Sequence, residues 1–346
     1  MVEVQNPRKT VCNSLIPRSG LAAKRLLPRA ASWLSHRSIA PFRCEQKTSP
    51  GAECGFGARE SLDSDFLKEQ TRNVMATCSV CKGDVYDAAR CCGTCAKLVE
   101  AIKQVIAKEE NRDNVQQRKK HNVLKPPQTF VPEVFWRQMV GCLCTSMSRV
   151  GPGTPLDHLE REEPYPLSLS LCKEQNAKGQ NALESYARQK ISGAGMRFAK
   201  RRAGYLAWNL DWLENKGGWS KVKCQFELLA GIPPRSPNAA DCLATAEKDK
   251  EVEREAAHVA MEMDGIGPKQ SRNLWSCLGL TRYETPLDSR VAKWFNKQQA
   301  SFIERKKLGS SRYYEGIENR IQSLCKEANE FPCVFDAAAF ISEENP

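Results

Sequence analysis

The chain has 346 residues, 41% of them hydrophobic, so it can bury a core in one or two domains. No apolar run approaches the roughly 18 residues of a membrane span, which predicts a soluble protein without a membrane partner. The net charge of +11 suggests an acidic partner, but the charge is unevenly spread. Residues 1–48 hold nine Lys and Arg against two acidic residues, whereas residues 121–346 hold 31 against 28. Nucleic-acid binding therefore has to be inferred from local motifs and not from bulk charge.

Residues 1–74 form a basic extension that we expect to be disordered or to act in targeting. The first 48 residues are rich in Arg, Ser and Ala, a composition that resembles a mitochondrial transit peptide. A disordered basic arm, or an extension upstream of a true start at Met75, fits the same composition. Sixteen cysteines in a chain of this length are too dilute for a disulfide scaffold, which indicates a reducing, intracellular compartment.

A cysteine cluster follows the extension. Cys78 and Cys81 form one C-x-x-C pair, and Cys92 and Cys95 form a second pair after a spacer of ten residues. Four thiolates in two such pairs suit a tetrahedral Zn²⁺ ion, which would be structural because no coordination position is left for water. Cys91 is an alternative to Cys92, and free thiols in a disordered segment are the alternative to a metal site. We expect that any catalysis by this protein requires no cofactor.

The expected domain organisation follows from changes in pattern along the chain. Apolar residues at helical spacing behind the cysteines predict a helix, and residues 75–110 form a cysteine-rich, zinc-type module. Residues 111–128 are charged and end in two prolines and a glutamine, a composition typical of a linker. Residues 129–342 contain long helical periodicities and no convincing alternating strand. The sequence therefore predicts a mainly α fold: one helical domain with a small N-terminal cysteine-rich module.

The stretch DGIGPKQSRNLWSCLGL, residues 264–280, predicts a helix-hairpin-helix. Gly265 and Gly267 permit left-handed backbone angles and leave backbone amides uncovered. Pro268 suits the first position of the following helix. Free amides at a helix start can hold a phosphate, so the hairpin can bind a DNA backbone without reading sequence. An ordinary glycine corner between two helices is the alternative.

Lys269 and Asp288 are the candidate catalytic residues, and each has a simpler interpretation. Lys269 lies in the first turn of a helix, where the helix dipole disfavours a charged ammonium and favours the neutral amine of a Schiff-base nucleophile. A protonated lysine that clamps a phosphate is its alternative. Asp288 precedes an apolar-periodic helix and fits an N-cap. It could also present a carboxylate to the cleft that holds Lys269, and one residue can do both.

These motifs resemble the helix-hairpin-helix DNA glycosylase superfamily, whose members carry a hairpin of the type G-[VI]-G-x-K and a later V-D-x-H. The spacing from Lys269 to Asp288 is similar to that of the 8-oxoguanine DNA glycosylase branch. The resemblance implies that Lys269 attacks the sugar of a flipped nucleotide, that Asp288 stabilises the developing charge, and that a Schiff base leads to strand cleavage by β-elimination. Arg290 replaces the family histidine as a phosphate anchor. Asn273 replaces the cysteine that packs on the damaged base, which puts the base preference in doubt.

A basic and aromatic segment before the hairpin predicts further contacts with DNA. Arg201 and Arg202 alternate with aromatic residues, which is typical of a phosphate-binding face, although a solvated helix face is the alternative. Together with the hairpin glycines, Lys269 and Arg290, they make up the predicted DNA-binding residues.

The sequence thus predicts a monomeric base-excision repair enzyme, a DNA glycosylase with AP lyase activity. Its partner would be duplex DNA with a damaged or abasic site, and the damaged base could be an oxidised guanine. The basic extension would place it in the nucleus or the mitochondrion. A non-catalytic helix-hairpin-helix DNA-binding protein with a zinc interaction module is the alternative. The third hypothesis is a zinc-mediated interaction protein whose helical domain is inert.

Overall fold

The computed structural model describes residues 76–78, 80, 84–85, 92–124, 128–145, 153–233, 246–300 and 302–344. Within these ranges the chain is helical apart from one antiparallel ladder, in which Ala76–Thr77 (β1) pairs with Asp84–Val85 (β2). The predicted mainly helical fold class is therefore confirmed. None of the described helices is long and apolar enough to cross a membrane. The predicted extension, residues 1–74, lies outside the described residues.

Thirteen α-helices follow one another through the described part of the chain. The first seven are α1 (Gly93–Ala107), α2 (Arg112–Arg118), α3 (Pro132–Thr145), α4 (Pro155–Arg161), α5 (Leu169–Ala177), α6 (Gln180–Gly193) and α7 (Ala199–Asn215). The other six are α8 (Gly218–Gly231), α9 (Ala246–Met261), α10 (Pro268–Cys277), α11 (Ser289–Lys297), α12 (Ser311–Glu327) and α13 (Pro332–Glu344). Short 3₁₀ turns span Glu109–Asn111 and Arg305–Lys307, and a π-helical turn spans Lys119–Val123.

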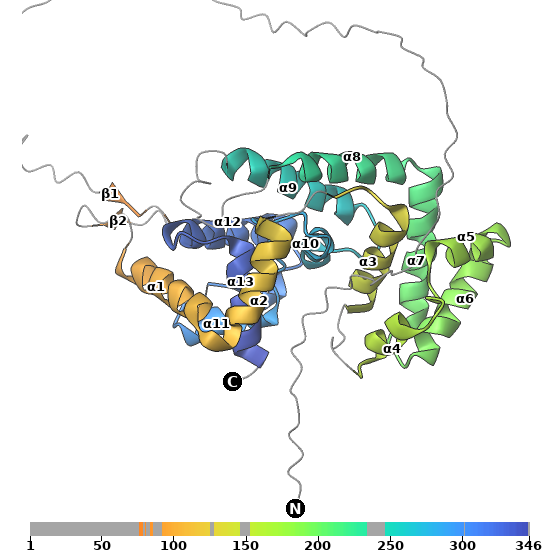
Figure 1. Ribbon diagram of the computed structural model, residues 1–346, viewed down its shortest axis with the longest axis horizontal. Helices are drawn as coiled ribbons and strands as arrows, with labels where there is room; N and C mark the ends of the chain where they lie inside the picture. The colour runs from red at the N-terminus through yellow and green to blue at the C-terminus, as the bar shows by residue number, and fades with distance from the viewer. Residues whose placement is uncertain are drawn as a thin grey trace, which may run out of the picture. The chain divides into compact units, whose positions relative to one another are not determined.

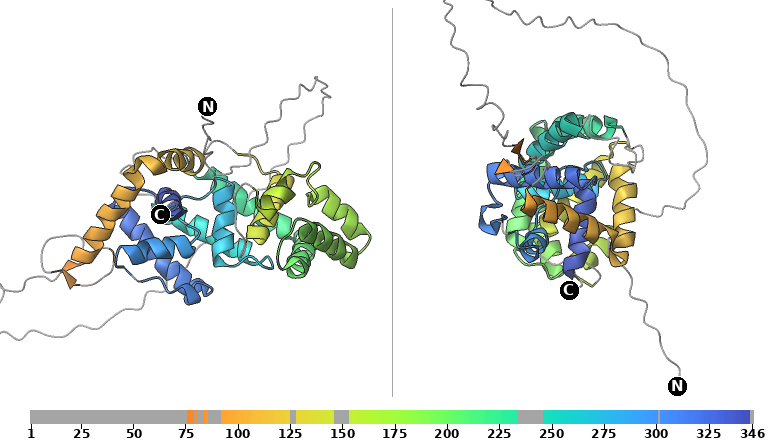
Figure 2. Two further views of the ribbon diagram at one scale, coloured as in Figure 1. Left: turned by 90° about the horizontal axis from the view of Figure 1, so that it is seen from below. Right: turned by 90° about the vertical axis from the view of Figure 1, so that its left-hand side faces the viewer.

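The helices bury two hydrophobic cores. Helices α3 to α10 enclose the first, in which Trp136 and Trp275 are fully buried. Helices α1, α2, α11, α12 and α13 enclose the second, around Phe295 and Phe335. Figures 1 and 2 show α10 between the two groups of helices. Because α10 belongs to the first core and α11 to the second, the space between their first turns is bounded by both cores.

Helix α13 packs against four other helices of the second core, namely α1, α2, α11 and α12. Its middle carries Ala337, Ala338 and Ala339, which are all buried. Short side chains allow helix axes to approach closely, because the separation of two packed helices depends on the residues at the contact. The alanine run therefore explains how one helix can serve as the centre of this group.

Helix α1 confirms the helix predicted behind the cysteines. Its buried residues are Cys95, Leu98, Val99, Ile102, Val105 and Ile106. These side chains pack into the second core, where α1 contacts both α12 and α13. The helix of the cysteine-rich segment thus shares a core with the C-terminal helices.

Residues 111–128, which the composition predicts to be a linker, are helical from their start to Val123. Helix α2 lies against α13, and Val115 and Val123 are buried. Asn122 is also buried, and its Nδ2 donates to the backbone carbonyls of Ser276 (3.0 Å) and Thr281 (2.8 Å). Many residues on the outer face of this segment are charged, and its buried inner face is short. Composition alone therefore does not reveal that the segment packs into the core.

Candidate active site

Residues 264–267 form the tight turn between α9 and α10, and α7 holds this turn in place. Asn209 donates its Nδ2 to the carbonyl of Asp264 (3.0 Å), and its Oδ1 accepts the amide of Asp264 (2.7 Å). Gly265 has a φ of +78°, in the left-handed region that favours glycine. A Cβ atom there would lie 2.4 Å from the ring of Tyr205. Glycine is therefore required at this position by both conformation and space.

Helix α10 starts directly after the turn, with Pro268 at its first position and Lys269 at its second. Gly267 is the N-cap and offers no side-chain bond to the helix start. A Cβ atom on Gly267 would meet no atom within 4 Å, so the space beside it is open. The first turn contains no acidic residue. The start of α10 therefore has the features that a phosphate needs, which are amides without a capping side chain and room beside them.

Asp288 caps α11, as the sequence predicts. Its Oδ1 accepts the backbone amides of Arg290 (2.8 Å) and Val291 (3.2 Å). Its Oδ2 accepts a hydrogen bond from Nη1 of Arg290 at 3.3 Å. The capping bonds fix the direction of the carboxylate, because Oδ1 is held by the helix while Oδ2 faces outward from it.

Lys269 and Asp288 lie close together, the lysine on α10 of the first core and the aspartate at the start of α11 of the second core. Lys269 Nζ is 3.7 Å from Asp288 Oδ2, and the lysine side chain is 44% exposed while that of the aspartate is 13% exposed. The nucleophile candidate is thus open to solvent and the carboxylate candidate is largely covered. Asp288 thus caps α11 and also lies beside Lys269, so both interpretations of this residue fit the geometry.

Helix α3 packs against α10. Asn273, one turn after Lys269, donates its Nδ2 to Sγ of Cys142 at 3.4 Å. Gln270 donates its Nε2 to Oγ1 of Thr145 at 3.4 Å. Burial raises the pKa of the Cys142 thiol well above its usual value, so this group is neutral. The α3 side of the site is therefore polar but carries no charge at these positions.

Helix α13 brings a second carboxyl group to the site, which the sequence analysis did not identify. Burial, together with the negative charge of Asp288, raises the pKa of Asp336 to about 6. The positive charges of Arg118, Lys269 and Arg290 oppose this rise. Arg118 Nη2 lies 3.9 Å from Asp336 Oδ2. Asp336 is 48 positions after Asp288 on an apolar helix, and no local pattern marks it.

Arg290 packs against the same helix. Its guanidinium carbon is 3.9 Å from the ring centre of Phe340, one turn after Asp336. With its bond to Asp288, this contact holds the arginine beside the carboxylate. Its side chain remains 32% exposed, so it can still meet a phosphate.

The two arginines predicted to bind DNA on α7 lie in different surroundings. Arg201 is exposed, and its guanidinium carbon is 5.3 Å from the ring centre of Tyr205, the residue that packs on the hairpin glycine. Arg202 is 4% exposed and points into the protein, where burial lowers its pKa. Neighbouring residues on a helix point in directions about 100° apart, so they cannot both lie on one face. Of these two arginines, only Arg201 is exposed to solvent.

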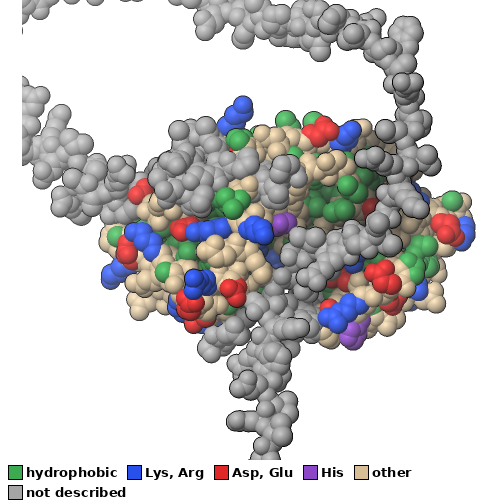
Figure 3. All heavy atoms as spheres, in the orientation of Figure 1, with side chains coloured by type: hydrophobic (Ala, Val, Ile, Leu, Met, Phe, Trp, Pro, Cys, Tyr) green, Lys and Arg blue, Asp and Glu red, His purple; other side chains and the backbone are tan. Residues whose placement is uncertain are grey.

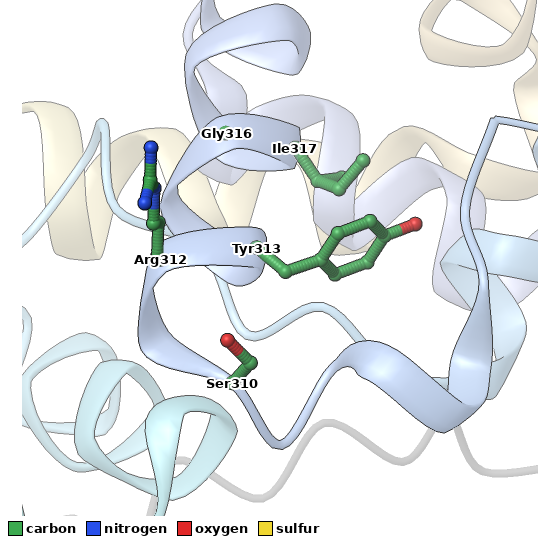
Figure 4. Close-up of a pocket in the computed structure, with 5 residues that line it drawn as sticks. All are labelled: Ser310, Arg312, Tyr313, Gly316 and Ile317. Carbon is green, nitrogen blue, oxygen red and sulfur yellow. The ribbon is translucent and has the colours of Figure 1, made fainter.

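Surface charge is mixed on the face that Figure 3 shows. Lys and Arg side chains lie among Asp and Glu side chains there and do not form one continuous basic area. A shallow pocket of about 430 Å³ lies on the first turns of α12. Ser310, Arg312, Tyr313, Gly316 and Ile317 line it (Figure 4). Neither Lys269 nor Asp288 borders this pocket, so it is separate from the candidate active site.

Three of the four predicted metal ligands lie together. The Sγ atoms of Cys78, Cys92 and Cys95 are all within 4.8 Å of one another. The backbone amide of Cys92 also donates to Sγ of Cys78 at 3.4 Å. Cys92 is the N-cap of α1 and Cys95 lies in its first turn, where the helix dipole stabilises negative sulfur. Cys81 and Cys91 lie outside the described residues.

Comparison with known proteins adds no assignment to either site. No protein-family model matches the sequence, and no curated protein is significantly similar to it. The functional interpretation of Lys269 and Asp288 therefore depends on their positions, their separation and the motifs around them.

Proposed function

We propose that the protein is a base-excision DNA glycosylase with AP lyase activity. The observation that carries this proposal is the 3.7 Å separation of Lys269 Nζ from Asp288 Oδ2, beside a glycine hairpin with open amides. An amine and a carboxylate at this distance are the pair that Schiff-base chemistry at a sugar carbon requires. The family resemblance of the motifs supports the same assignment.

In the proposed reaction, the neutral amine of Lys269 attacks C1′ of a flipped nucleotide. The bond from C1′ to the base breaks, and the base leaves with the bonding electron pair and takes up a proton. Asp288 stabilises the positive charge on the sugar and accepts a proton from the attacking nitrogen. The C1′–O4′ bond then breaks, O4′ takes up the proton from Asp288, and the sugar ring opens to an iminium at C1′. This iminium loses a C2′ proton, and β-elimination expels the 3′ phosphate and cuts the strand.

DNA would bind through the hairpin and its neighbours. The amides near Gly265 and Gly267 would hold one phosphate at the start of α10, and Arg290 and Arg201 would hold others. These contacts position the duplex without reading its sequence. Flipping the nucleotide costs roughly a few kcal/mol in unstacking and is easiest at a damaged pair.

The lesion is proposed only by class, as a damaged base that could be an oxidised guanine. Asn273 occupies the position that would face the base, and its amide contacts Cys142. Because an amide both donates and accepts hydrogen bonds, this position favours a base with polar groups on its edge.

Borohydride trapping tests the proposal. The protein is incubated with duplex DNA carrying oxidised bases or abasic sites, and borohydride reduces any iminium to a stable covalent adduct. We expect an adduct with the native chain and none with Lys269→Gln, while DNA binding is retained. Asp288→Asn is expected to lower the trapping rate by about 10²- to 10⁴-fold, the range for loss of an acid–base group.

Lys178→Gln is the matched control, because Lys178 is an exposed lysine paired with Glu174 on α5, outside the site. Its trapping should equal that of the native chain. Absence of an adduct on every lesion, with DNA binding intact, would sink the lyase assignment.

A non-catalytic DNA-binding protein is the second candidate. The 44% exposure of Lys269 favours it, because a protonated lysine there could pair with both Asp288 and a DNA phosphate. This candidate predicts salt-dependent DNA binding, weakened by Lys269→Gln, with no adduct under any condition. Trapping therefore separates the two functions.

We also infer that the cysteine cluster holds a structural Zn²⁺. Three sulfur atoms within 4.8 Å of one another, with an amide donating to one of them, fit a thiolate metal centre. Cys81 is proposed as the fourth ligand on its spacing alone. The ion would fasten the residues before α1 to the start of that helix.

A further inference from the structure

The segment from Thr281 to Leu287 leads to Asp288 and has no helix or strand of its own. Six of its seven residues are buried, and only Pro286 is partly exposed. Buried backbone amides need hydrogen-bond partners, and a segment outside regular structure must find them on side chains. The partners of these amides therefore determine where the segment lies and where Asp288 points.

Glu253 is the main partner. It lies on α9 and its side chain is fully buried. Its Oε1 accepts the amide of Arg282 (2.9 Å), and its Oε2 accepts the amides of Tyr283 (2.7 Å) and Glu284 (2.9 Å). One carboxyl group thus satisfies three consecutive amides. Removing such an acceptor leaves buried donors unpaired, which costs more than the bond itself contributes.

Helix α12 holds the second half of the segment. Glu318 Oε1 accepts the amide of Thr285 at 3.1 Å. The hydroxyl of Tyr314 accepts the amide of Leu287 and donates to the carbonyl of Thr285 (3.0 Å). The backbone amide of Leu287, the residue before Asp288, is therefore held by the hydroxyl oxygen of Tyr314.

Glu253 connects the two sides of the candidate active site. Helix α9, on which it lies, runs directly into the hairpin that precedes Lys269. The segment it binds ends at Asp288. Glu253 shares this link between the two sides with Arg272 of α10, whose Nη2 lies 2.9 Å from Oε2 of Glu284 in the segment.

We propose that Glu253 is a positioning residue for Asp288, and that its three amide bonds, with the Tyr314 hydroxyl, hold the carboxylate beside Lys269. Glu253 is not a catalytic residue, because it is buried on α9 behind the segment and touches neither group. The inference rests on the proposed function, since the positioned group is the proposed partner of the nucleophile.

Glu253→Gln tests the inference, because it replaces one acceptor oxygen by an NH₂ group that must face amide donors. We expect the single-turnover rate of borohydride trapping at saturating DNA to fall by about 10- to 100-fold, the range for misplacement of a reacting group by about 1 Å. The dissociation constant for abasic DNA should stay within about twofold, because the hairpin amides are untouched. Glu251→Gln is the matched control, since Glu251 is an exposed glutamate on the same helix.

A second variant and a stability control separate positioning from loss of fold. Tyr314→Phe removes only one hydroxyl and is expected to lower the trapping rate in the same direction by a smaller factor. Leu183→Ala creates a cavity beside α6. It destabilises the first core at a position away from the segment that leads to Asp288. Its trapping rate at saturating DNA should stay at the native value as long as the chain is folded.

Amide hydrogen exchange supplies a readout that does not need activity. In Glu253→Gln, protection should fall at residues 282–284 and also at residues 290 and 291, whose amides Asp288 caps. Native trapping rates in both variants, or a rate loss matched by Leu183→Ala, would overturn the inference. If the native chain forms no adduct, the proposed function fails. The inference then stands or falls on whether protection at residues 290 and 291 is lost or unchanged.

Discussion

At the scale of single residues, two buried carboxyl groups near the candidate active site have raised pKa values. Burial raises the pKa of Glu253 to about 7, against the opposing effects of Arg282 and three amide bonds. Burial, with the charge of Asp288, raises the pKa of Asp336 to about 6. In both cases the loss of hydration outweighs the favourable partners. The two groups differ in location, since Glu253 bonds to the segment that ends at Asp288, whereas the charges of Asp288 and Lys269 act on the pKa of Asp336.

Asp336→Asn is expected to change how the free energy of unfolding depends on pH. The pKa of Asp336 is raised in the folded chain, so its contribution is fully present below the unfolded pKa and is lost as pH rises through about 6. Between pH 4 and pH 7 the native chain should therefore lose roughly 2 kcal/mol relative to Asp336→Asn. Urea unfolding of both proteins at each pH measures this difference in the free energy of unfolding. Glu253 contributes equally to both proteins, so its effect cancels in the comparison. Parallel curves over this range would contradict the prediction.

At the scale of elements, the hairpin between α9 and α10 depends on two glycines for different reasons. Gly265 has a φ of +78° and is pressed against Tyr205 and Leu143. Gly267 has a φ of −91°, which any residue adopts, and its neighbourhood is open. The first glycine is thus needed for folding, whereas the second keeps space beside the amides at the start of α10.

Replacing each glycine by alanine should separate these roles. Gly265→Ala is expected to lower the free energy of unfolding by roughly 2–4 kcal/mol, from left-handed strain and from overpacking against the Tyr205 ring. Gly267→Ala should change it by less than about 0.5 kcal/mol. It should nevertheless weaken DNA binding by about tenfold, because the new methyl group occupies the space of the phosphate. Urea unfolding and fluorescence anisotropy measure the two effects, and equal stability losses would rule out the distinction.

At the scale of the whole molecule, the cysteine-rich segment and the C-terminal helices share the second core. Cys78 and Cys95 are buried in that core, together with Val291, Trp294 and Phe295 of α11. Helix α11 begins after Asp288, so the cysteine cluster and the helix that Asp288 caps belong to the same core. A metal ion there would stabilise α1 and, through the shared core, α11.

Loss of the metal is therefore expected to lower the stability of the whole folded chain. Cys92→Ser should reduce the zinc content of the purified full-length protein and lower its Tm by about 5–10 °C, which corresponds to a few kcal/mol. Cys224→Ser is the control, because Cys224 is exposed on α8. Elemental analysis and thermal unfolding measure the two quantities. Absence of zinc from the native chain, with the same Tm in all three proteins, would refute the metal site.

Short-range patterns were sufficient for several of these features. Helical spacing predicts α1, and the residues around Asp288 predict its cap. Both depend on neighbouring residues, where backbone geometry dictates which side chains share a face. The closeness of Lys269 to Asp288 was predicted from the family resemblance of the motifs. Composition was less reliable, because it marked residues 111–128 as a linker although α2 packs on α13.

The sequence by itself thus determined the helical class, the hairpin, the cysteine ligand types and the two candidate catalytic residues. Only the tertiary structure decided that Arg202 is buried, that Asp336 borders the site and that Glu253 holds the segment before Asp288. These three facts concern groups far apart in the chain, or the direction of one side chain relative to a core. Burial and long-range contact arise from the packing of whole helices, which no local pattern encodes.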